Sequence, residues 1–233
     1  MEIIADVGQN HNGDIGQAVE LIHVAKECGA DVAKFQVYDA RALFPPKEKN
    51  EWFDYNCKTE LTRGQLQLLS KECDKAGIEF LASVFDVERI AWLEEVGVKR
   101  YKIASRSIHE RELIIALGKT RKPLLVSLGF WDEKEFPKIE SLAPVDFLYC
   151  ISKYPTSPLD LKLGQVDFSR YAGFSDHTIG VVAAMAALAR GARVIEKHLT
   201  LDKKMYGPDH ACSMTPDELR QLHQFRQELK QCL

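Results

Sequence analysis

The chain has 233 residues, of which 45% are hydrophobic and 28% charged, and its formal net charge is −3. This composition is typical of a globular protein with a sizeable core. The slightly acidic balance excludes an overall basic field, so we expect no nucleic-acid or membrane partner.

The N-terminal stretch MEIIADVG enters a strand-like run directly, without the basic and apolar regions of a signal peptide. No apolar run approaches the roughly 18 residues of a membrane span. The cysteines show neither CxxC pairing nor a short repeated spacing, which argues against a zinc knuckle or a disulfide scaffold. They are Cys28, Cys57, Cys73, Cys150, Cys212 and Cys232. We therefore expect reduced thiols and a cytoplasmic location.

Short apolar runs alternate with longer amphipathic segments along the chain. Strands are expected at residues 2–6, 32–37, 79–83, 100–105, 123–129, 145–150, 171–175 and 193–199. Helices are expected at residues 15–30, 63–77, 87–97, 110–119, 180–192 and 215–232. A weaker helix is expected at residues 132–142, broken by Pro137, and an irregular link with one helical turn after the sixth strand.

Eight strands with helical crossovers predict an α/β fold, a TIM (β/α)8 barrel forming a single domain over residues 1–233. The stretch GQNHNG (8–13) lacks the GxGxxG spacing, which disfavours a Rossmann fold. Residues 38–60, which carry Trp52, Phe53 and Tyr55, are expected to form an ordered loop or lid.

Polar side chains gather at the C-terminal ends of the expected strands, where TIM barrels carry their chemistry. They are Asp6, Asn10, His11, Asn12, Lys34, Gln36, Ser83, Lys102, Ser105, Ser127, Ser152, Lys153, Tyr154, Ser175, Asp176, His177, Glu196, Lys197 and His198. Two stretches are especially dense in them, GFSDHT (173–178) and VIEKHLT (194–200). This pattern predicts a binding site shared by the strand ends.

Lys34 and Lys102 each lie inside an otherwise apolar strand, where an isolated ammonium is costly to desolvate. Each lysine either pairs with a buried carboxylate in the core or points into the barrel mouth toward an anionic ligand. The second interpretation is favoured because hydroxyl donors suited to a phosphate or carboxylate surround the same rim. These donors are Ser83, Ser105, Ser127 and Ser175.

His177 and His198 follow neighbouring strands, so their imidazoles can approach each other in a closed barrel. Two such histidines suit a divalent metal completed by water and substrate oxygens, with Asp176 or Glu196 as a further ligand or orienting group. A hydrogen-bonded structural pair is the alternative.

The remaining candidates are weaker. His23, His109 and His223 fall on expected helices or helix starts and are expected at the surface. Asp209, in the turn-rich loop YGPDHACSM (206–214), could reach over the barrel mouth.

Eight segments carry a specific combination of motifs: EIIADVGQNHNG, GADVAKFQVY, YKIASRS, LLVSLG, YPTSP, GFSDHTIG, VIEKHLT and GPDHACSMTPDEL. Through them the chain closely resembles the sialic acid synthase (N-acetylneuraminate synthase) family. The resemblance implies a barrel that condenses phosphoenolpyruvate with an open-chain amino sugar such as N-acetylmannosamine. It also implies Mn²⁺ or Mg²⁺ as a Lewis acid on the aldehyde, and a possible homodimer.

The resemblance also implies roles for individual residues. His177 and His198 match the metal ligands, and Asp6 matches an acidic position for proton transfer or orientation. The phosphoenolpyruvate-binding set is matched by Lys34, Ser83, Lys102, Ser105, Ser127 and Ser175. The sugar-site positions are matched by Gln36, Tyr154 and Asp209. Of these residues, Asp6, Lys102, His177 and His198 are the expected catalytic residues.

Three departures from the family pattern concern the sugar half of the site. The motif GSGE reads Ala104-Ser105-Arg106-Ser107 here, which replaces a carboxylate by Ser107. Asp6 stands where Glu is usual, which moves the carboxylate by about a bond length. The chain ends at Leu233, without the family's antifreeze-like C-terminal domain, so either the chain was cut or the protein lacks that domain.

These departures leave alternatives open. A synthase with another acceptor aldehyde is one, and a non-catalytic barrel that senses a phosphorylated ligand is a second. A metal-dependent lyase that runs the cleavage direction is a third.

Overall fold

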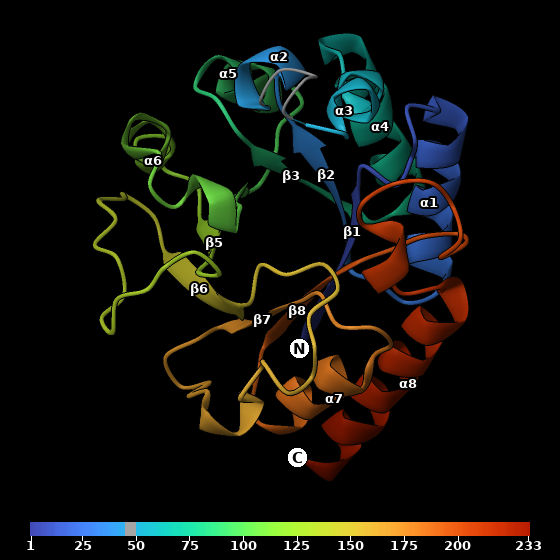
Figure 1. The fold of residues 1–233 in the computed structure, drawn as a ribbon, viewed down its shortest axis with the longest axis vertical. Coiled ribbons are helices and arrows are strands. Elements are labelled where there is room, and N and C mark those ends of the chain that lie inside the picture. The colour runs from blue at the N-terminus through green and yellow to red at the C-terminus, as the bar shows by residue number, and fades with distance from the viewer. Residues whose placement is uncertain (45–49) are drawn as a thin grey trace.

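The computed structural model describes residues 1–44 and 50–233, whose strands form a closed barrel (Figure 1). All neighbouring strands pair in parallel, as the predicted TIM barrel requires. The strands are β1 (Glu2–Gly8), β2 (Val32–Val37), β3 (Glu79–Val84), β4 (Tyr101–Ile103), β5 (Leu124–Ser127), β6 (Val145–Cys150), β7 (Gly173–Asp176) and β8 (Val194–His198).

The helices surround much of this barrel, and those on the right of Figure 1 form a continuous outer layer. They are α1 (Ile15–Glu27), α2 (Ala40–Leu43), α3 (Phe53–Thr59), α4 (Arg63–Ala76), α5 (Glu88–Glu95), α6 (Arg111–Gly118), α7 (Val182–Ala189) and α8 (Pro216–Cys232). Local sequence fixes the start of two of them, because α4 and α8 begin with capping boxes at Thr62 and Thr215.

The inner face of the barrel is apolar at one level and polar at the next. A closed apolar cluster fills the lower level, formed by Ile4, Val32, Leu81, Leu125, Leu148 and Ala172. Because inward-facing residues recur every second position along a strand, the next inward positions are Asp6, Lys34, Ser83, Ser127 and Cys150. In each of these strands the side chain two residues after the apolar one is polar. The site therefore lies directly on the packed apolar layer.

The predicted helix at residues 132–142 is wrong. Residues 128–144, all of them described, form no helix between β5 and β6. Pro137 removes a backbone donor and its ring clashes with a preceding helical turn. The irregular segment covers β6 instead through Phe136, whose ring packs against Phe147 and Tyr171 at 4.8 and 4.7 Å. This side of the barrel, at the left of Figure 1, is covered by loops.

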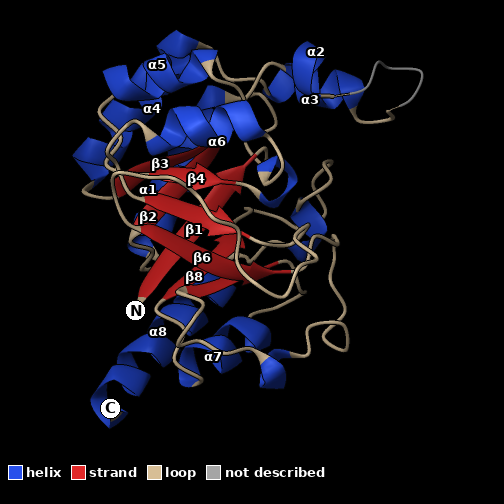
Figure 2. Cartoon of the chain, turned by 90° about the vertical axis from the view of Figure 1, so that its left-hand side faces the viewer, coloured by secondary structure: helices blue, strands red, loops and turns tan. Residues whose placement is uncertain are grey.

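Residues 38–60 also differ from the predicted loop, because they contain the short helices α2 and α3; residues 45–49 lie outside the described part. Trp52 packs on Tyr206 of the loop after β8, with ring centroids 5.2 Å apart. Figure 2 shows α2, α3 and long loops at the end toward which the strand arrows point. The link between β6 and β7 contains the single helical turn that was expected, a 3₁₀ turn at Leu163–Gln165.

Two further features of the described residues concern their helices and their cysteines. None of their helices is both long and apolar enough to cross a membrane. All six cysteines are free thiols, and Cys28, Cys73, Cys150 and Cys212 are buried.

Candidate active site

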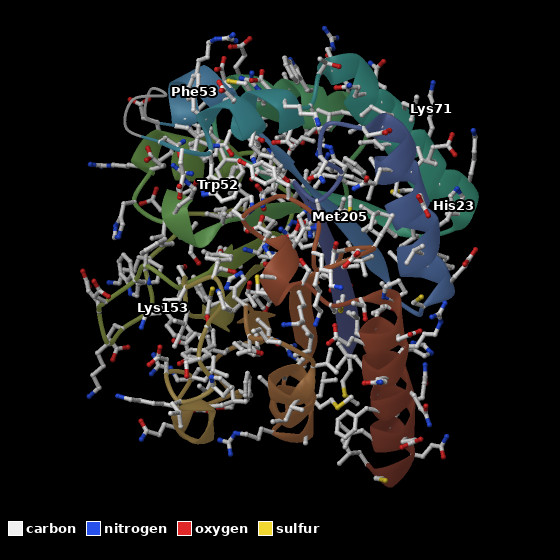
Figure 3. The ribbon with its side chains drawn as sticks, turned by 45° about the vertical axis from the view of Figure 1, so that its right-hand side comes forward. His23, Trp52, Phe53, Lys71, Lys153 and Met205 are labelled. Carbon is white, nitrogen blue, oxygen red and sulfur yellow. The ribbon has the colours of Figure 1, made fainter. Side chains whose placement is uncertain are left out.

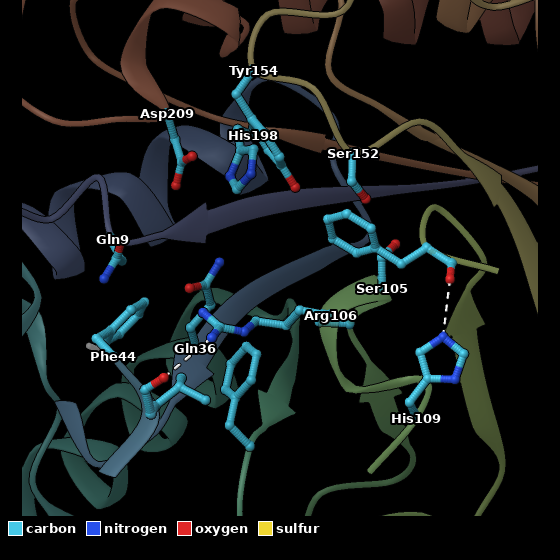
Figure 4. A pocket seen from close by; sticks show the side chains of 14 residues that line it. Gln9, Gln36, Phe44, Ser105, Arg106, His109, Ser152, Tyr154, His198 and Asp209 are labelled. Atoms are coloured by element: carbon cyan, nitrogen blue, oxygen red, sulfur yellow. Dashed lines mark hydrogen bonds between the residues drawn. The ribbon is translucent and has the colours of Figure 1, made fainter. Parts of the chain in front are cut away.

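Two connected cavities open at the C-terminal end of the barrel. The inner one measures about 50 Å³, and its walls contain Asp6, Lys34, Gln36, Ser83, Lys102, Ala104, Ser105, Ser127, Tyr154, Ser175, His177, Glu196 and His198. The outer one measures about 670 Å³ and shares Gln36, Ala104, Ser105, Tyr154 and His198 with it (Figure 4). The structure thus brings the two lysines, the four rim serines and both strand-end histidines into one cavity.

Strand register explains why these residues meet. Asp6 is paired with Lys34 on one side and with His198 on the other. Ser83 is the register partner of Lys102, and Ser175 is the register partner of Glu196. Their side chains therefore leave the sheet at nearly the same height.

Lys34 is fully enclosed by acidic and hydroxyl partners. Its Nζ donates to Asp6 Oδ2 at 2.7 Å and to Ser83 Oγ at 3.3 Å, and lies 3.7 Å from Glu196 Oε2. Burial by itself would lower the pKa of Lys34, but the two carboxylates outweigh it and raise that pKa. Lys34 is therefore a firmly held cation.

Lys102 is buried to the same degree but is paired less closely. Its Nζ donates to Ser127 Oγ at 2.7 Å and to the Ile103 carbonyl at 2.9 Å, whereas its nearest carboxylate oxygen, Glu196 Oε1, is 3.7 Å away. Burial lowers the pKa of Lys102, and Glu196 compensates only in part. The pKa of Lys102 is lowered and that of Lys34 is raised because Lys34 has a carboxylate in direct hydrogen-bond contact, whereas the partners of Lys102 at that distance are a hydroxyl and a carbonyl.

Glu196 lies between the two lysines and is the acidic residue whose position the sequence did not predict. Burial would raise its pKa, but Lys102 and Lys34 together lower the pKa of Glu196 to about 2. Ser175 Oγ donates to its Oε1 at 2.8 Å. The lysines thus form the buried ion pairs of the first interpretation and also line a shared cavity. That this cavity takes an anionic ligand stays a prediction.

The two imidazoles have ring centroids 5.7 Å apart. His177 Nδ1 lies 3.0 Å from the Ile151 carbonyl, a contact that fixes the ring and directs Nε2 elsewhere. Tyr154 packs on both rings, at 4.1 Å from His177 and 6.2 Å from His198. His198 Nδ1 has Asp6 Oδ2 at 3.4 Å. The two histidines are therefore held side by side without bonding to each other.

The donor set fits a divalent ion with open coordination positions. Three buried polar atoms of this cavity have no hydrogen-bond partner: Asp6 Oδ1, Glu196 Oε2 and His198 Nδ1. Buried polar atoms are normally satisfied by protein, water or a ligand, so these atoms are available to a bound ion, its water or a substrate. In the described residues no group of three or more His, Cys, Asp or Glu side chains forms a ready-made metal site. An ion held by His177 and His198 would need water or substrate oxygens as its other ligands.

Ser105 is placed by a close approach that only glycine permits. The Gly129 N–H donates to Ser105 Oγ at 3.0 Å. A Cβ at Gly129 would lie 2.3 Å from Ser152 Oγ and 2.8 Å from Ser105 Oγ. Since Gly129, in the loop after β5, has no side chain, the hydroxyl of Ser105 can occupy this place at the inner cavity.

The outer cavity contains the expected sugar-site residues and several others. Gln36 and Tyr154 line both cavities, and Asp209 lies near His198 at the upper end of Figure 4. Ser152, expected at the end of the sixth strand, also lines this cavity. Sequence reasoning did not assign to the site six further lining residues: Gln9, Phe44, Phe85, Arg106, His109 and Phe130. Most of them lie in loops that follow the strands. The alternation of residues along a strand says nothing about where a side chain in such a loop lies.

Two candidates lie elsewhere. Asp176 faces away from the cavity and forms a fully buried ion pair with Lys197 at 3.0 Å, so the alternative in which it orients the metal site is wrong. Ser107 lines neither of the two connected cavities and borders a separate cavity of about 250 Å³ next to the start of α6.

The three histidines that were expected at the surface differ in exposure. His23 is exposed, as expected, and lies at the outer edge of the molecule in Figure 3. His109 is exposed but lines the outer cavity, with Nε2 at 3.1 Å from the Phe130 carbonyl. His223 is half-buried and lies against Gly29, whose carbonyl is 3.0 Å from its Nδ1. The surface interpretation is therefore incomplete for His109 and holds in part for His223.

The chain resembles known proteins over nearly its whole length. The model of the NeuB family matches residues 21–233. The N,N'-diacetyllegionaminic acid synthase of Legionella pneumophila is 36% identical over 95% of this chain and 70% of its own length. The human N-acetylneuraminate-9-phosphate synthase is 33% identical over 94% of this chain and 67% of its own length. The structure of an N-acetylneuraminic acid synthetase from Leptospira borgpetersenii superposes with a TM-score of 0.88 at 28% identity, covering 99% of this chain and 84% of that one.

Proposed function

The chain belongs to the NeuB family, and on this premise we propose that it condenses phosphoenolpyruvate with an open-chain amino-sugar aldehyde. The products are a 2-keto-3-deoxy sugar acid and phosphate. One observation carries the proposal: Lys34, Lys102, His177 and His198 line the same small cavity, which opens into a larger one.

The inner cavity suits the anionic groups of phosphoenolpyruvate. Two buried ammonium groups and hydroxyls of Ser83, Ser105 and Ser127 supply charge-assisted donors, which bind phosphate and carboxylate strongly. Gly129 contributes by bringing the Ser105 hydroxyl within reach.

His177 and His198 would hold Mn²⁺ or Mg²⁺, whose chemistry there is to polarise the aldehyde carbonyl of the acceptor. The contact of His177 with the Ile151 carbonyl and the packing of Tyr154 on both rings pre-orient the two imidazoles. Preformed ligands need little reorganisation when the substrate arrives.

In the reaction, C3 of phosphoenolpyruvate forms a bond to the aldehyde carbon, and the aldehyde oxygen takes a proton. Water then adds at C2, and the C2–O bond to phosphate breaks. Asp6 and Glu196 are the carboxylates of the inner cavity in the described chain. Glu196 is ionised at neutral pH and stabilises positive charge. Asp6 has its Oδ2 at 3.4 Å from His198 Nδ1 and its Oδ1 without a partner, so it is placed to hold or move the proton.

The acceptor would occupy the outer cavity. Its volume of about 670 Å³ suits a small-molecule ligand. Gln36, Tyr154 and Asp209 would bind the hydroxyl and amide groups of the sugar. Ser107, whose presence motivated the non-catalytic alternative, lines neither cavity, which favours a synthase over a sensor.

Other properties follow from the same proposal. The six free thiols fit a reducing compartment, so we place the protein in the cytoplasm. Its partners would be small molecules, and a homodimer stays a prediction.

A product assay tests the proposal. The protein is incubated with phosphoenolpyruvate, Mn²⁺ and a panel of N-acetylated aldoses, and phosphate and thiobarbituric-acid-reactive product are measured together. Equal amounts of both are expected. Failure with every acceptor, or release of pyruvate from a 2-keto-3-deoxy acid without the forward reaction, would contradict the proposal.

A further inference from the structure

The outer cavity has two chemically different ends. Asp209, Tyr154 and His198 lie together at one end of Figure 4, and Arg106 lies across the cavity beside Phe44 and Gln36. The reactive aldehyde must approach His198 if that residue binds the metal. The tail of the acceptor must therefore extend toward the end where Arg106 lies.

Arg106 is held in place by local structure. It lies in the 3₁₀ turn Ser105–Ser107 directly after β4, so its backbone follows a residue that lines the inner cavity. Its guanidinium carbon lies 5.0 Å from the centroid of the Phe44 ring, and its Nη2 donates to the Leu43 carbonyl at 3.2 Å. These two contacts fix the plane of the guanidinium and leave other N–H donors available.

Among the residues that the structure describes, no carboxylate neutralises this guanidinium. Within the described residues, no Asp or Glu oxygen lies within ion-pair distance of Arg106. Arg106 also lines a neighbouring cavity of about 250 Å³, whose acidic residues are Asp39, Asp86 and Glu110. Asp86 and Asp39 pair with Arg89 at 3.0 and 3.5 Å. Glu110 acts on Arg106 only through longer-range attraction.

Arg106 also differs from the other polar residues of the cavity. In the described part of the lining it is the one side chain with a permanent positive charge, and Asp209 is the one carboxylate. Gln9 is occupied, since its amide nitrogen donates to Tyr38, Asn56 and Thr59. An anionic group would thus be attracted to the Arg106 end and repelled from the Asp209 end, which specifies one orientation.

We propose that Arg106 selects an acceptor aldose that carries an anionic group, a phosphate or a carboxylate, at the end opposite its aldehyde. The inference rests on the proposed function of the site. A guanidinium over an aromatic ring is suited to a planar, two-pronged contact with either group, and Phe44 and Phe85 provide apolar walls beside it.

Turnover of matched acceptors tests this inference. N-acetylmannosamine, its 6-phosphate and its 6-carboxylate (the uronic acid) differ only at the end opposite the aldehyde. We expect the wild type to use one of the two anionic acceptors with kcat/KM roughly 10- to 100-fold above that for the neutral sugar, the range of a charged hydrogen bond. The more efficient of the two identifies the group.

Variants separate the role of charge from that of shape. Arg106→Gln should remove that preference by raising KM for the anionic acceptor, while KM for phosphoenolpyruvate and kcat for the neutral sugar stay unchanged. Arg106→Lys should restore part of the preference. The control is Arg111→Gln, an exposed arginine on α6 that does not line the outer cavity, and it should behave as wild type.

A binding arm keeps this inference distinct from the proposed function. Calorimetry with the corresponding alditols, which lack the aldehyde and cannot react, should show Arg106-dependent binding of the anionic compound. Absence of turnover with all three sugars would contradict the proposed function, and the alditols then decide the inference alone. Equal affinity for neutral and anionic alditols, or binding unaffected by Arg106→Gln, overturns the inference even if turnover is normal.

Discussion

Replacement of Lys102 by methionine tests the anion site most informatively. Asp6, Glu196, Lys34 and Lys102 form a group of two buried carboxylates and two buried ammonium groups, with Glu196 at 3.7 Å from each lysine. The group is therefore balanced in charge. Lys102→Met keeps the length and volume of the side chain and leaves one excess negative charge facing the cavity.

The expected size of the effect follows from the contacts that disappear. Charged hydrogen bonds contribute about 1.5–3 kcal/mol, and each 1.4 kcal/mol corresponds to about a tenfold change in affinity. We expect Kd for phosphoenolpyruvate to rise roughly 10- to 100-fold.

Stability should respond separately, because Glu196 keeps Lys34 and Ser175 but loses one cation. The loss of one partner of a buried charge pair is destabilising, and we expect about 1–3 kcal/mol here. Adding Glu196→Gln to Lys102→Met removes the excess charge. The double variant should recover most of the free energy of unfolding without recovering phosphoenolpyruvate affinity.

Calorimetric titration with phosphoenolpyruvate measures the affinity, and urea unfolding measures stability. Lys122→Met is the matched control. Lys122 forms a partly exposed ion pair with Glu94 at 2.8 Å and lines neither cavity. Unchanged affinity in a folded Lys102→Met protein would refute the assignment of Lys102 to the anion site. A double variant that regains affinity would show that the single substitution acted through the excess charge of Glu196 and not through loss of the ammonium contact.

Three further predictions concern other parts of the molecule. Gly129→Ala should displace the Ser105 hydroxyl and raise KM for phosphoenolpyruvate several-fold, whereas Gly64→Ala, where an added Cβ meets nothing within 4 Å, should leave kinetics unchanged; equal kinetics in both would contradict the close-approach argument. His198→Ala should abolish Mn²⁺ binding, measured by calorimetry, while circular dichroism stays native, and retained Mn²⁺ affinity would remove His198 from the metal site. Burial, opposed by Asp14, lowers the pKa of His11 from 6.5 to about 4, so the unfolded chain binds the proton first and stability is lost as pH falls from 6.5 to 4, by about 3 kcal/mol. His11→Gln should remove this component from the difference in unfolding free energy between pH 7 and pH 4, and an identical pH dependence in both proteins would show that His11 is not responsible.

The sequence predicted the inner cavity well because its signals are local. A lysine inside an apolar strand, or a serine at a strand end, is recognisable without any knowledge of neighbours. Period-two alternation then places Lys34 and Gln36 on one face, and the closed barrel brings their strand next to that of Asp6. The fold and these positions follow from the same pattern.

What the sequence did not predict depends on long-range geometry. The sequence offered Glu196 and Asp176 as alternative acidic residues beside an expected metal site. The structure is needed to show that Glu196 lies between the two lysines. Arg106 and His109 line the outer cavity through loop conformations that have no periodic signal. The segment 132–142 has helical periodicity, but Pro137 and the packing of Phe136 onto β6 favour an irregular cover.

The central claim is that the anion site and the metal site are one pocket. Crystals soaked with phosphoenolpyruvate and Mn²⁺ test it directly, because the anomalous signal of manganese locates the ion independently of the ligand. We predict manganese bound to both His177 and His198, with phosphoenolpyruvate in the same cavity and in contact with Lys34 and Lys102. Manganese or phosphoenolpyruvate bound at separate places in the molecule would contradict the account.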